Sequence, residues 1–236
     1  MALPSYSVRQ SPKAKNLRLK VTPREGLYVI VPRGFDEGKI PAILERKKAW
    51  IADALAKARA RRRFLEPRPA RHLPDSLPLC AIGEVWPVVY RHDDTKAGLR
   101  LRAERGEVTI SGAYPSREAV LAKLKEWLRR RVRETLFPLA RSLSEKHRLQ
   151  LGTLFVKSQR TRWASCSARK NLALNAKLLF LSPELVRYVL IHELCHTVHM
   201  NHSKDFWRLV ASYEPRYRIL DQMLREAWKT VPPWTF

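Results

Sequence analysis

The chain has 236 residues, of which 45% are hydrophobic and 29% are charged. This length and composition allow one large or two small globular domains and exclude a globally disordered chain. The first twenty residues lack the apolar core of a secretory signal, and no run approaches 18 apolar residues. Three cysteines without CxxC spacing, Cys80, Cys166 and Cys195, are typical of a reducing compartment. We therefore expect a soluble, cytoplasmic protein with no membrane partner and an oligomeric state that the composition leaves open.

The charge balance is strongly basic, with 46 Lys and Arg against 22 Asp and Glu, a formal net charge of +24. The excess is spread along the chain, so it is not a basic tail. Such a field attracts polyanions such as nucleic acid or acidic protein surfaces, and it gives no information about the fold. The basic runs Arg59–Arg63 and Arg129–Arg133 are where salt-dependent nucleic-acid contacts would form, and solvated helix faces are the alternative explanation for both.

The first half of the chain reads mainly as strands. Alternating or β-branched runs predict strands at 6–9, 17–21, 27–31, 79–82, 85–90, 99–101 and 108–110. Apolar residues at helical spacing predict one helix over about 36–63, and prolines between Glu66 and Pro78 predict a linker. Residues 8–115 are thus expected to form a β-rich region with one helix.

The second half reads mainly as helices. Ser116 is a good N-cap for an amphipathic helix, which Pro138 is expected to kink or end. Ser182 and Pro183 begin another helix as N-cap and first helical residue. Further strands are predicted at 154–156 and 172–174, and shorter helices at 204–212 and 216–229. Residues 116–229 are expected to form a second region, and the fold class is α+β.

A metal-binding pattern lies near the end of the helix that begins at Pro183. His192 and His196 are four residues apart, so on a helix they share one face, where two imidazoles can bind one tetrahedral zinc ion. Glu193 lies beside them without being a ligand, as in HExxH metallohydrolases. These side chains could instead be packing residues, but burying a His and a Glu within this apolar stretch is costly without a partner.

Three residues compete to be the third ligand. A helix rises about 1.5 Å per residue, which puts His199 roughly 7–8 Å beyond a zinc ion held by the first two histidines. His202 can return to the metal if the chain turns sharply after the helix. Glu214 lies at a spacing that suits a carboxylate on a following helix. We favour His202 over Glu214.

Three protein ligands leave zinc an open position for water, whose pKa the metal lowers toward 7. Glu193 can take the proton of that water and pass it to a leaving amine. Arg162, Tyr213 and Tyr217 are candidate donors to the oxyanion. Hydrolysis of a non-peptide amide would use the same machinery. The alternative from another class is a basic nucleic-acid-binding protein with a structural or vestigial zinc site, which would have no use for Glu193.

The sequence resembles the YgjP-like metallopeptidases, which are akin to the SprT-like and WLM zincins. The similarity extends over about 8–229 and is carried by the stretches 161–167, 172–175, 188–196, 201–203, 206–207 and 215–217. It implies a zincin-like catalytic region with an HExxH helix, one zinc ion on His192, His196 and His202, and catalytic Glu193. Arg162, Trp163, Asn175 and Tyr217 are the resulting candidates for substrate binding or oxyanion stabilisation.

The resemblance also suggests a mode of substrate binding and a partner. By analogy with zincins, a peptide would add as a strand beside 172–175. Ala164 stands where the family usually has glycine, which would matter if that position needed positive φ. SprT-like and WLM relatives cut proteins on DNA, so a DNA-associated protease is a further hypothesis for this basic chain.

Overall fold

The computed structural model describes residues 4–22, 25–65, 73–93, 95 and 98–236. The chain divides into two compact units, residues 1–67 and 68–236, which we describe separately. Together their helices and sheets make an α+β protein, as predicted from the sequence. The predicted division between 115 and 116 follows the change from strands to a long helix and stays a prediction.

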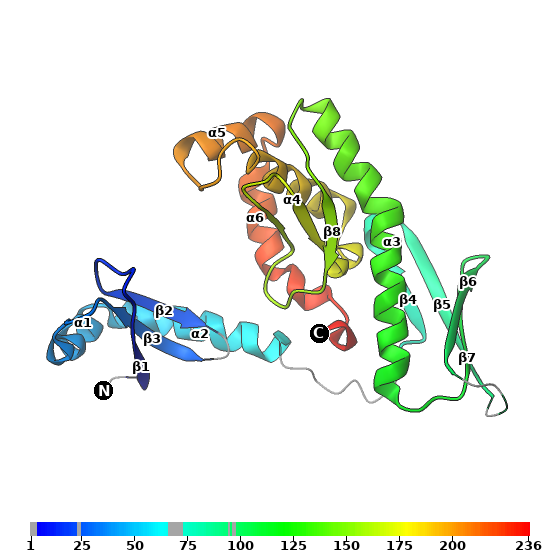
Figure 1. The fold of residues 1–236 in the computed structure, drawn as a ribbon, viewed down its shortest axis with the longest axis horizontal. Coiled ribbons are helices and arrows are strands. Elements are labelled where there is room, and N and C mark those ends of the chain that lie inside the picture. Colours follow the sequence, from blue (N-terminus) through cyan, green and yellow to red (C-terminus); the bar gives the residue numbers. More distant parts are fainter. Residues whose placement is uncertain (1–3, 23–24, 66–72, 94, 96–97) are drawn as a thin grey trace. The chain divides into compact units, whose positions relative to one another are not determined.

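The first unit is a three-stranded sheet with helices (Figure 1). Strand β3 (Gly26–Val31) lies in the centre, parallel to β1 (Tyr6–Gln10) and antiparallel to β2 (Arg18–Thr22). The helix predicted over 36–63 is instead a 3-10 turn (Glu37–Lys39) followed by α1 (Ile40–Arg46) and α2 (Lys48–Leu65). Its buried core is Leu27, Val29, Val31, Ile40, Leu44 and Ile51.

A four-stranded sheet begins the second unit, in the order β4-β5-β7-β6. Its strands are β4 (Ser76–Leu79), β5 (Glu84–His92), β6 (Arg100–Glu104) and β7 (Glu107–Gly112). The strand predicted at 79–82 is wrong, since Cys80–Ile82 forms a 3-10 turn that ends at Gly83 with φ 67°. Of the predicted linker, 66–72 lie outside the described residues and Ser76–Pro78 belong to β4.

Helix α3 (Arg117–Lys146) contacts both sheets of the second unit (Figure 1). It begins as predicted, because Ser116 Oγ accepts a hydrogen bond from the amide of Ala119 at 3.1 Å. The helix does not end at Pro138. A proline removes one amide donor, whereas the buried row that includes Leu136, Ala140 and Leu143 continues across it and holds both halves in one helix.

The second sheet of this unit is three-stranded and has the order β8-β10-β9. Strand β10 (Leu172–Asn175) is parallel to β8 (Leu154–Lys157) and antiparallel to β9 (Ala164–Cys166). The hypothesis that a peptide adds beside 172–175 is therefore wrong, because both edges of β10 are already paired. Ala164 lies in extended backbone of β9, so it does not need the positive φ that would favour glycine.

Three helices follow the second sheet: α4 (Pro183–Cys195), α5 (Lys204–Tyr213) and α6 (Tyr217–Glu226). Short 3-10 turns precede and follow them at Ala176–Phe180, Ala227–Thr230 and Pro233–Thr235. Helix α4 packs against α3, α5, α6 and β9, which places it inside the core of the unit. Among the described residues, no helix is long and apolar enough to cross a membrane.

Candidate metal centre

Helix α4 is a rigid support for the HExxH residues. Ser182 Oγ caps the helix by accepting from the amide of Leu185 at 3.4 Å, and Pro183 occupies its first turn, as predicted. Most of its side chains are buried, which fixes its rotation about its axis. His192 lies in the last turn and His196 is the C-cap residue, so the two imidazoles project from one face.

The chain then turns back on itself immediately after α4. The amides of Thr197 and Val198 donate to carbonyls of the last helical turn at 2.9 and 3.1 Å, and Thr197 Oγ1 adds a bond of 2.7 Å to the Leu194 carbonyl. Helix α5 starts soon afterwards, with Ser203 Oγ accepting from the amide of Phe206 at 3.3 Å. This tight return brings His202, which directly precedes that N-cap, back to the face of α4.

His192, His196 and His202 come together as a group whose ligand nitrogens all lie within 4.8 Å of one another. The Nε2 atoms of His192 and His202 are 3.1 Å apart. Two nitrogens bound to one tetrahedral zinc at 2.0–2.1 Å are about 3.3 Å apart, so this spacing fits a shared zinc ion. No carboxylate or thiol joins the group among the residues that the structure describes.

Hydrogen bonding and burial favour the neutral form that metal binding requires. His196 Nδ1 lies 3.0 Å from the His199 carbonyl oxygen, which can only accept, so Nδ1 carries the proton and Nε2 is free to bind a metal. Burial, helped by the two neighbouring imidazoles, lowers the pKa of His192 to about 4. Burial also lowers the pKa of His196.

Aromatic side chains of α5 hold the imidazoles from one side. Phe206 is fully buried and stacks on His196, with ring centroids 4.5 Å apart and planes at 24°. Trp207 stacks on His202 at 5.6 Å and 27°. Neither ring was predicted as a site residue, because apolar residues at helical spacing predict only core packing.

Glu193 is 9% exposed and faces the backbone of Cys166 in β9. Burial raises the pKa of Glu193 to about 7, while the backbone amide of Cys166 and the charge of Arg162 act in the opposite direction. The carboxylate is not part of the three-histidine group. A carboxyl with a pKa of about 7 can exchange a proton near neutral pH.

The side chains of the two other candidates for the third ligand, Glu214 and His199, lie outside the histidine group. Glu214 is the C-cap residue of α5 and lies 3.7 Å from Arg187 Nε. His199 contributes its carbonyl oxygen to the site, through His196, and its ring is outside the group. The structure thus brings together the histidines that the sequence favours, and their role as ligands stays a prediction.

The other predicted site residues differ in their surroundings. Trp163 is 7% exposed and stacks on Trp228 with centroids 3.7 Å apart, which is a packing role. Tyr217 stacks on Trp207 at 5.3 Å, and its hydroxyl accepts from Arg218. Arg162 is exposed.

Asn175 is fully buried, and its amide contacts backbone groups of its own unit. Tyr213, the other candidate oxyanion donor, donates its hydroxyl to the carbonyl of His147 at 3.4 Å. Asn175 and Tyr213 thus contact backbone groups of the protein, whereas the sequence suggests that they contact the substrate. Among the candidates for substrate binding or oxyanion stabilisation, Arg162 is the one whose charge acts on Glu193.

The two cysteines nearest the site, Cys166 and Cys195, are free, and their thiols have raised pKa values. Cys195 is fully buried in α4, and burial raises its pKa to about 12. Burial and the charge of Glu193 raise the pKa of Cys166 to about 11. Because metal binding and nucleophilic attack need the thiolate, these values favour a packing role for both cysteines.

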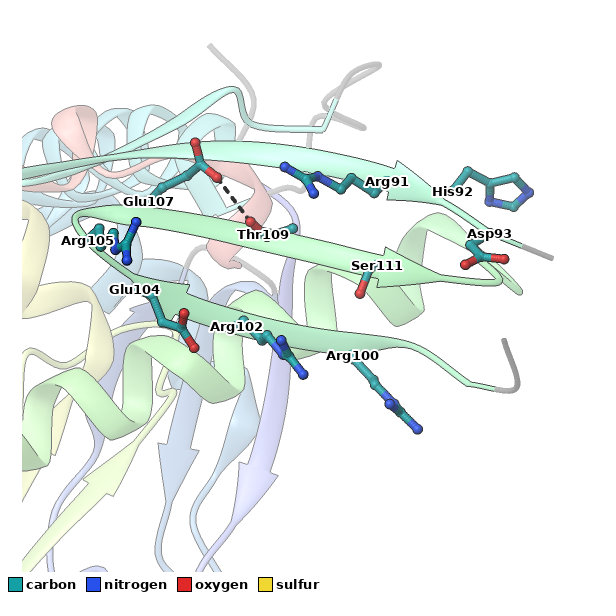
Figure 2. A pocket seen from close by; sticks show the side chains of 10 residues that line it. All are labelled: Arg91, His92, Asp93, Arg100, Arg102, Glu104, Arg105, Glu107, Thr109 and Ser111. Atoms are coloured by element: carbon teal, nitrogen blue, oxygen red, sulfur yellow. Dashed lines mark hydrogen bonds between the residues drawn. The ribbon is translucent and has the colours of Figure 1, made fainter. Parts of the chain in front are cut away.

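A separate polar hollow of about 860 Å³ lies on the outer face of the four-stranded sheet (Figure 2). The short side chains of Thr109 and Ser111 form its floor on β7, between longer side chains of β5 and β6. Its lining is Arg91, His92, Asp93, Arg100, Arg102, Glu104, Arg105, Glu107, Thr109 and Ser111. Its lining includes both basic and acidic groups, and none of the three clustered histidines belongs to it.

Comparison with known proteins identifies the class. A metallopeptidase domain family matches residues 15–227, and the chain is a metallopeptidase. That family is the YgjP-like family, and this chain belongs to it. No curated protein matches the sequence.

Two solved structures are similar to part of the chain. The metallopeptidase zymogen abylysin of Pyrococcus abyssi is 22% identical, with a TM-score of 0.38, over 41% of this chain and 98% of its own. The metallopeptidase zymogen jannalysin of Methanocaldococcus jannaschii is 20% identical, with a TM-score of 0.34, over 38% of this chain and 92% of its own. Both similarities are weak, so the assignment depends on the family match.

Proposed function

We propose that this protein is a zinc-dependent metallopeptidase in which His192, His196 and His202 bind one zinc ion and Glu193 is the general base. The observation that carries the proposal is the arrangement of α4, where three imidazole nitrogens meet beside a buried carboxylate that is not part of their group. A structural zinc site would have no use for such a carboxylate. Zinc is favoured because three imidazoles with an open fourth position are typical of catalytic zinc.

A zinc ion in this group would polarise the scissile carbonyl and make water a better nucleophile at neutral pH. Glu193 accepts a proton from the attacking water and then donates it to the leaving amine. Burial supports both steps, since a carboxyl with a pKa of about 7 can both take and release a proton near neutrality. The phenylalanine and tryptophan of α5 keep two of the imidazoles in place.

The second sheet and α4 together support a zincin-like arrangement in which a peptide binds along β9. The amide of Asn175 donates to the Trp163 carbonyl at 2.9 Å, so Trp163 bonds toward β10. Bonded residues alternate in an antiparallel ladder, which leaves the backbone groups of Ala164 and Cys166 directed away from β10. A substrate strand would pair with this edge at Ala164 and lie beside Glu193, which the amide of Cys166 faces.

Ala164→Pro is expected to lower kcat/KM for a peptide about 10-fold or more while the bound zinc is retained. Proline removes the amide that this edge strand directs away from β10. Ala164→Gly keeps that amide and is the matched control, with turnover close to wild type. Steady-state kinetics and metal analysis of both variants measure the effect. Equal turnover by both variants would contradict binding along β9.

A DNA-associated protease is the second candidate, and the net charge of +24 is the observation that favours it. The second of the two basic runs is partly paired with acidic side chains. In α3, Arg131 bonds to Glu84 and Glu134 at 2.7 and 2.9 Å, so part of that run is neutralised. The side chains of Arg59–Arg63 lie outside the described part of the chain.

The proposal is tested by incubating zinc-loaded protein with a mixture of peptides and denatured proteins, with and without single-stranded DNA. Mass spectrometry then identifies new termini. Cleavage by the wild type and none by Glu193→Gln is the expected result. Cleavage only with DNA would establish the second candidate, and unchanged cleavage by the variant would contradict the role of Glu193.

A further inference from the structure

Two buried polar side chains have no part in the proposed mechanism. Asn175 is 0% exposed and Lys177 is 2% exposed, and burial lowers the pKa of Lys177 to about 8. Burying an amide and an ammonium is unfavourable unless each is hydrogen-bonded, so their contacts indicate what they hold in place. Both contact the same segment, the connection between β8 and β9.

The contacts fix this connection at two points. Asn175 Nδ2 donates to the carbonyl oxygens of Gln159 and Arg162, both at 2.7 Å. Lys177 Nζ donates to the same Gln159 oxygen at 3.1 Å. The next residue, Trp163, is anchored in turn by its stacking on Trp228. The backbone from Gln159 to Trp163 is thereby held by buried groups, although it lies in a loop.

The segment so held presents two cations. Arg160 and Arg162 are both exposed, and neither lies within ion-pair distance of a carboxylate among the residues that the structure describes. Arg162 directly precedes Trp163 and the edge strand β9, and its charge acts on Glu193. A guanidinium on a backbone held in this way, close enough to Glu193 for their charges to interact and without an ion pair among the described residues, is suited to an anionic group on the ligand.

We propose that Arg162 binds a carboxylate of the substrate, so that the enzyme selects acidic peptides. The inference rests on the proposed peptidase function and narrows its substrate class. An Arg–carboxylate pair is directional and bidentate, which gives more selectivity than the diffuse positive field of the protein alone. The carboxylate is either an Asp or Glu side chain near the cleaved bond or the C-terminus of the peptide.

The test uses sets of peptides that differ only in the carboxylate. For a peptide that the wild type cleaves, the Asp or Glu side chain is replaced by its amide, and separately the C-terminus is amidated. We expect one of these changes to lower kcat/KM about 10-fold or more, mainly through KM, as loss of a charge-assisted bond predicts. Which change has the effect identifies the source of the carboxylate.

Variants separate Arg162 from general charge. Arg162→Glu is expected to lose the preference for the carboxylate and to favour a lysine at the sensitive position. Arg162→Lys keeps the charge without the bidentate geometry and is expected to retain only part of the preference. Arg100→Glu, on the outer sheet face (Figure 2), makes the same change in net charge and should behave as wild type.

Binding gives a second measurement that does not need turnover. In the Glu193→Gln background, Arg162→Glu is expected to weaken binding of a labelled acidic peptide about 10-fold or more in fluorescence anisotropy, whereas Arg100→Glu leaves it unchanged. Equal cleavage of acidic and neutral peptides by the wild type would overturn this inference and leave the peptidase function standing. Absence of cleavage of every peptide would instead contradict the peptidase function.

Discussion

Glu193→Gln is expected to lower kcat about 10³-fold while the protein still binds one zinc ion per chain. General-base catalysis contributes about 10²–10⁴-fold, and glutamine has the shape of glutamate without its ability to accept a proton. Since Glu193 is not in the histidine group, the zinc site itself should be intact. Steady-state kinetics with a cleaved peptide, together with metal analysis, measures both quantities.

The pH dependence of stability shows whether this variant is properly folded. Burial raises the pKa of Glu193 from 4.5 to about 7, so the folded state disfavours the charged carboxylate. In the metal-free wild type this group therefore lowers the free energy of unfolding as pH rises from about 4.5 to about 7. Glutamine removes that penalty, and metal-free Glu193→Gln should be at least as stable as wild type at pH 8 in denaturant unfolding. A clear loss of stability would show that lost activity reflects misfolding.

His202→Ala is expected to weaken zinc affinity more than about 100-fold and to abolish turnover at equimolar zinc. Loss of a supporting hydrogen bond around a metal site already costs about 10–100-fold, and a ligand contributes more. His202 is exposed, so truncating it leaves no buried cavity and should change the stability of the metal-free protein little. Competition with a chromophoric chelator measures the affinity.

Two matched variants distinguish His202 from the residues that compete with it. His199→Ala keeps the backbone carbonyl that accepts from His196 Nδ1, and it should bind zinc as tightly as wild type. Glu214→Gln loses the interaction with Arg187 and should also keep the metal. Loss of zinc in Glu214→Gln with retention in His202→Ala would instead assign the third ligand to Glu214.

The parts of the site that depend only on local sequence were predictable, namely the start of α4 and the shared face of its two histidines. The i, i+4 spacing of His192 and His196 puts them on one face of any helix, and Ser182 with Pro183 fixes where that helix starts. The return of His202 was predictable only as one option. It depends on hydrogen bonds of the turn after α4, such as that of Thr197, which no periodicity encodes.

Features that depend on distant partners were not predictable. The sequence predicts no strand at the three residues of β9, and only their pairing with β10 makes them a strand. Because β10 is paired on both sides, the proposed peptide-binding edge is that of β9 instead of β10. Asn175 illustrates a second limit, because an amide can bind substrate or backbone equally well, and only the fold shows that it holds the loop before β9.

The most direct test of a zinc peptidase built on these three histidines is a zinc titration of metal-stripped protein, with peptide cleavage measured at each step. The account predicts that activity rises in proportion to added zinc and stops rising at one ion per chain, and that Glu193→Gln stays inactive throughout. Activity that survives complete removal of metal, or one tightly bound zinc with no cleavage of any peptide, would contradict it.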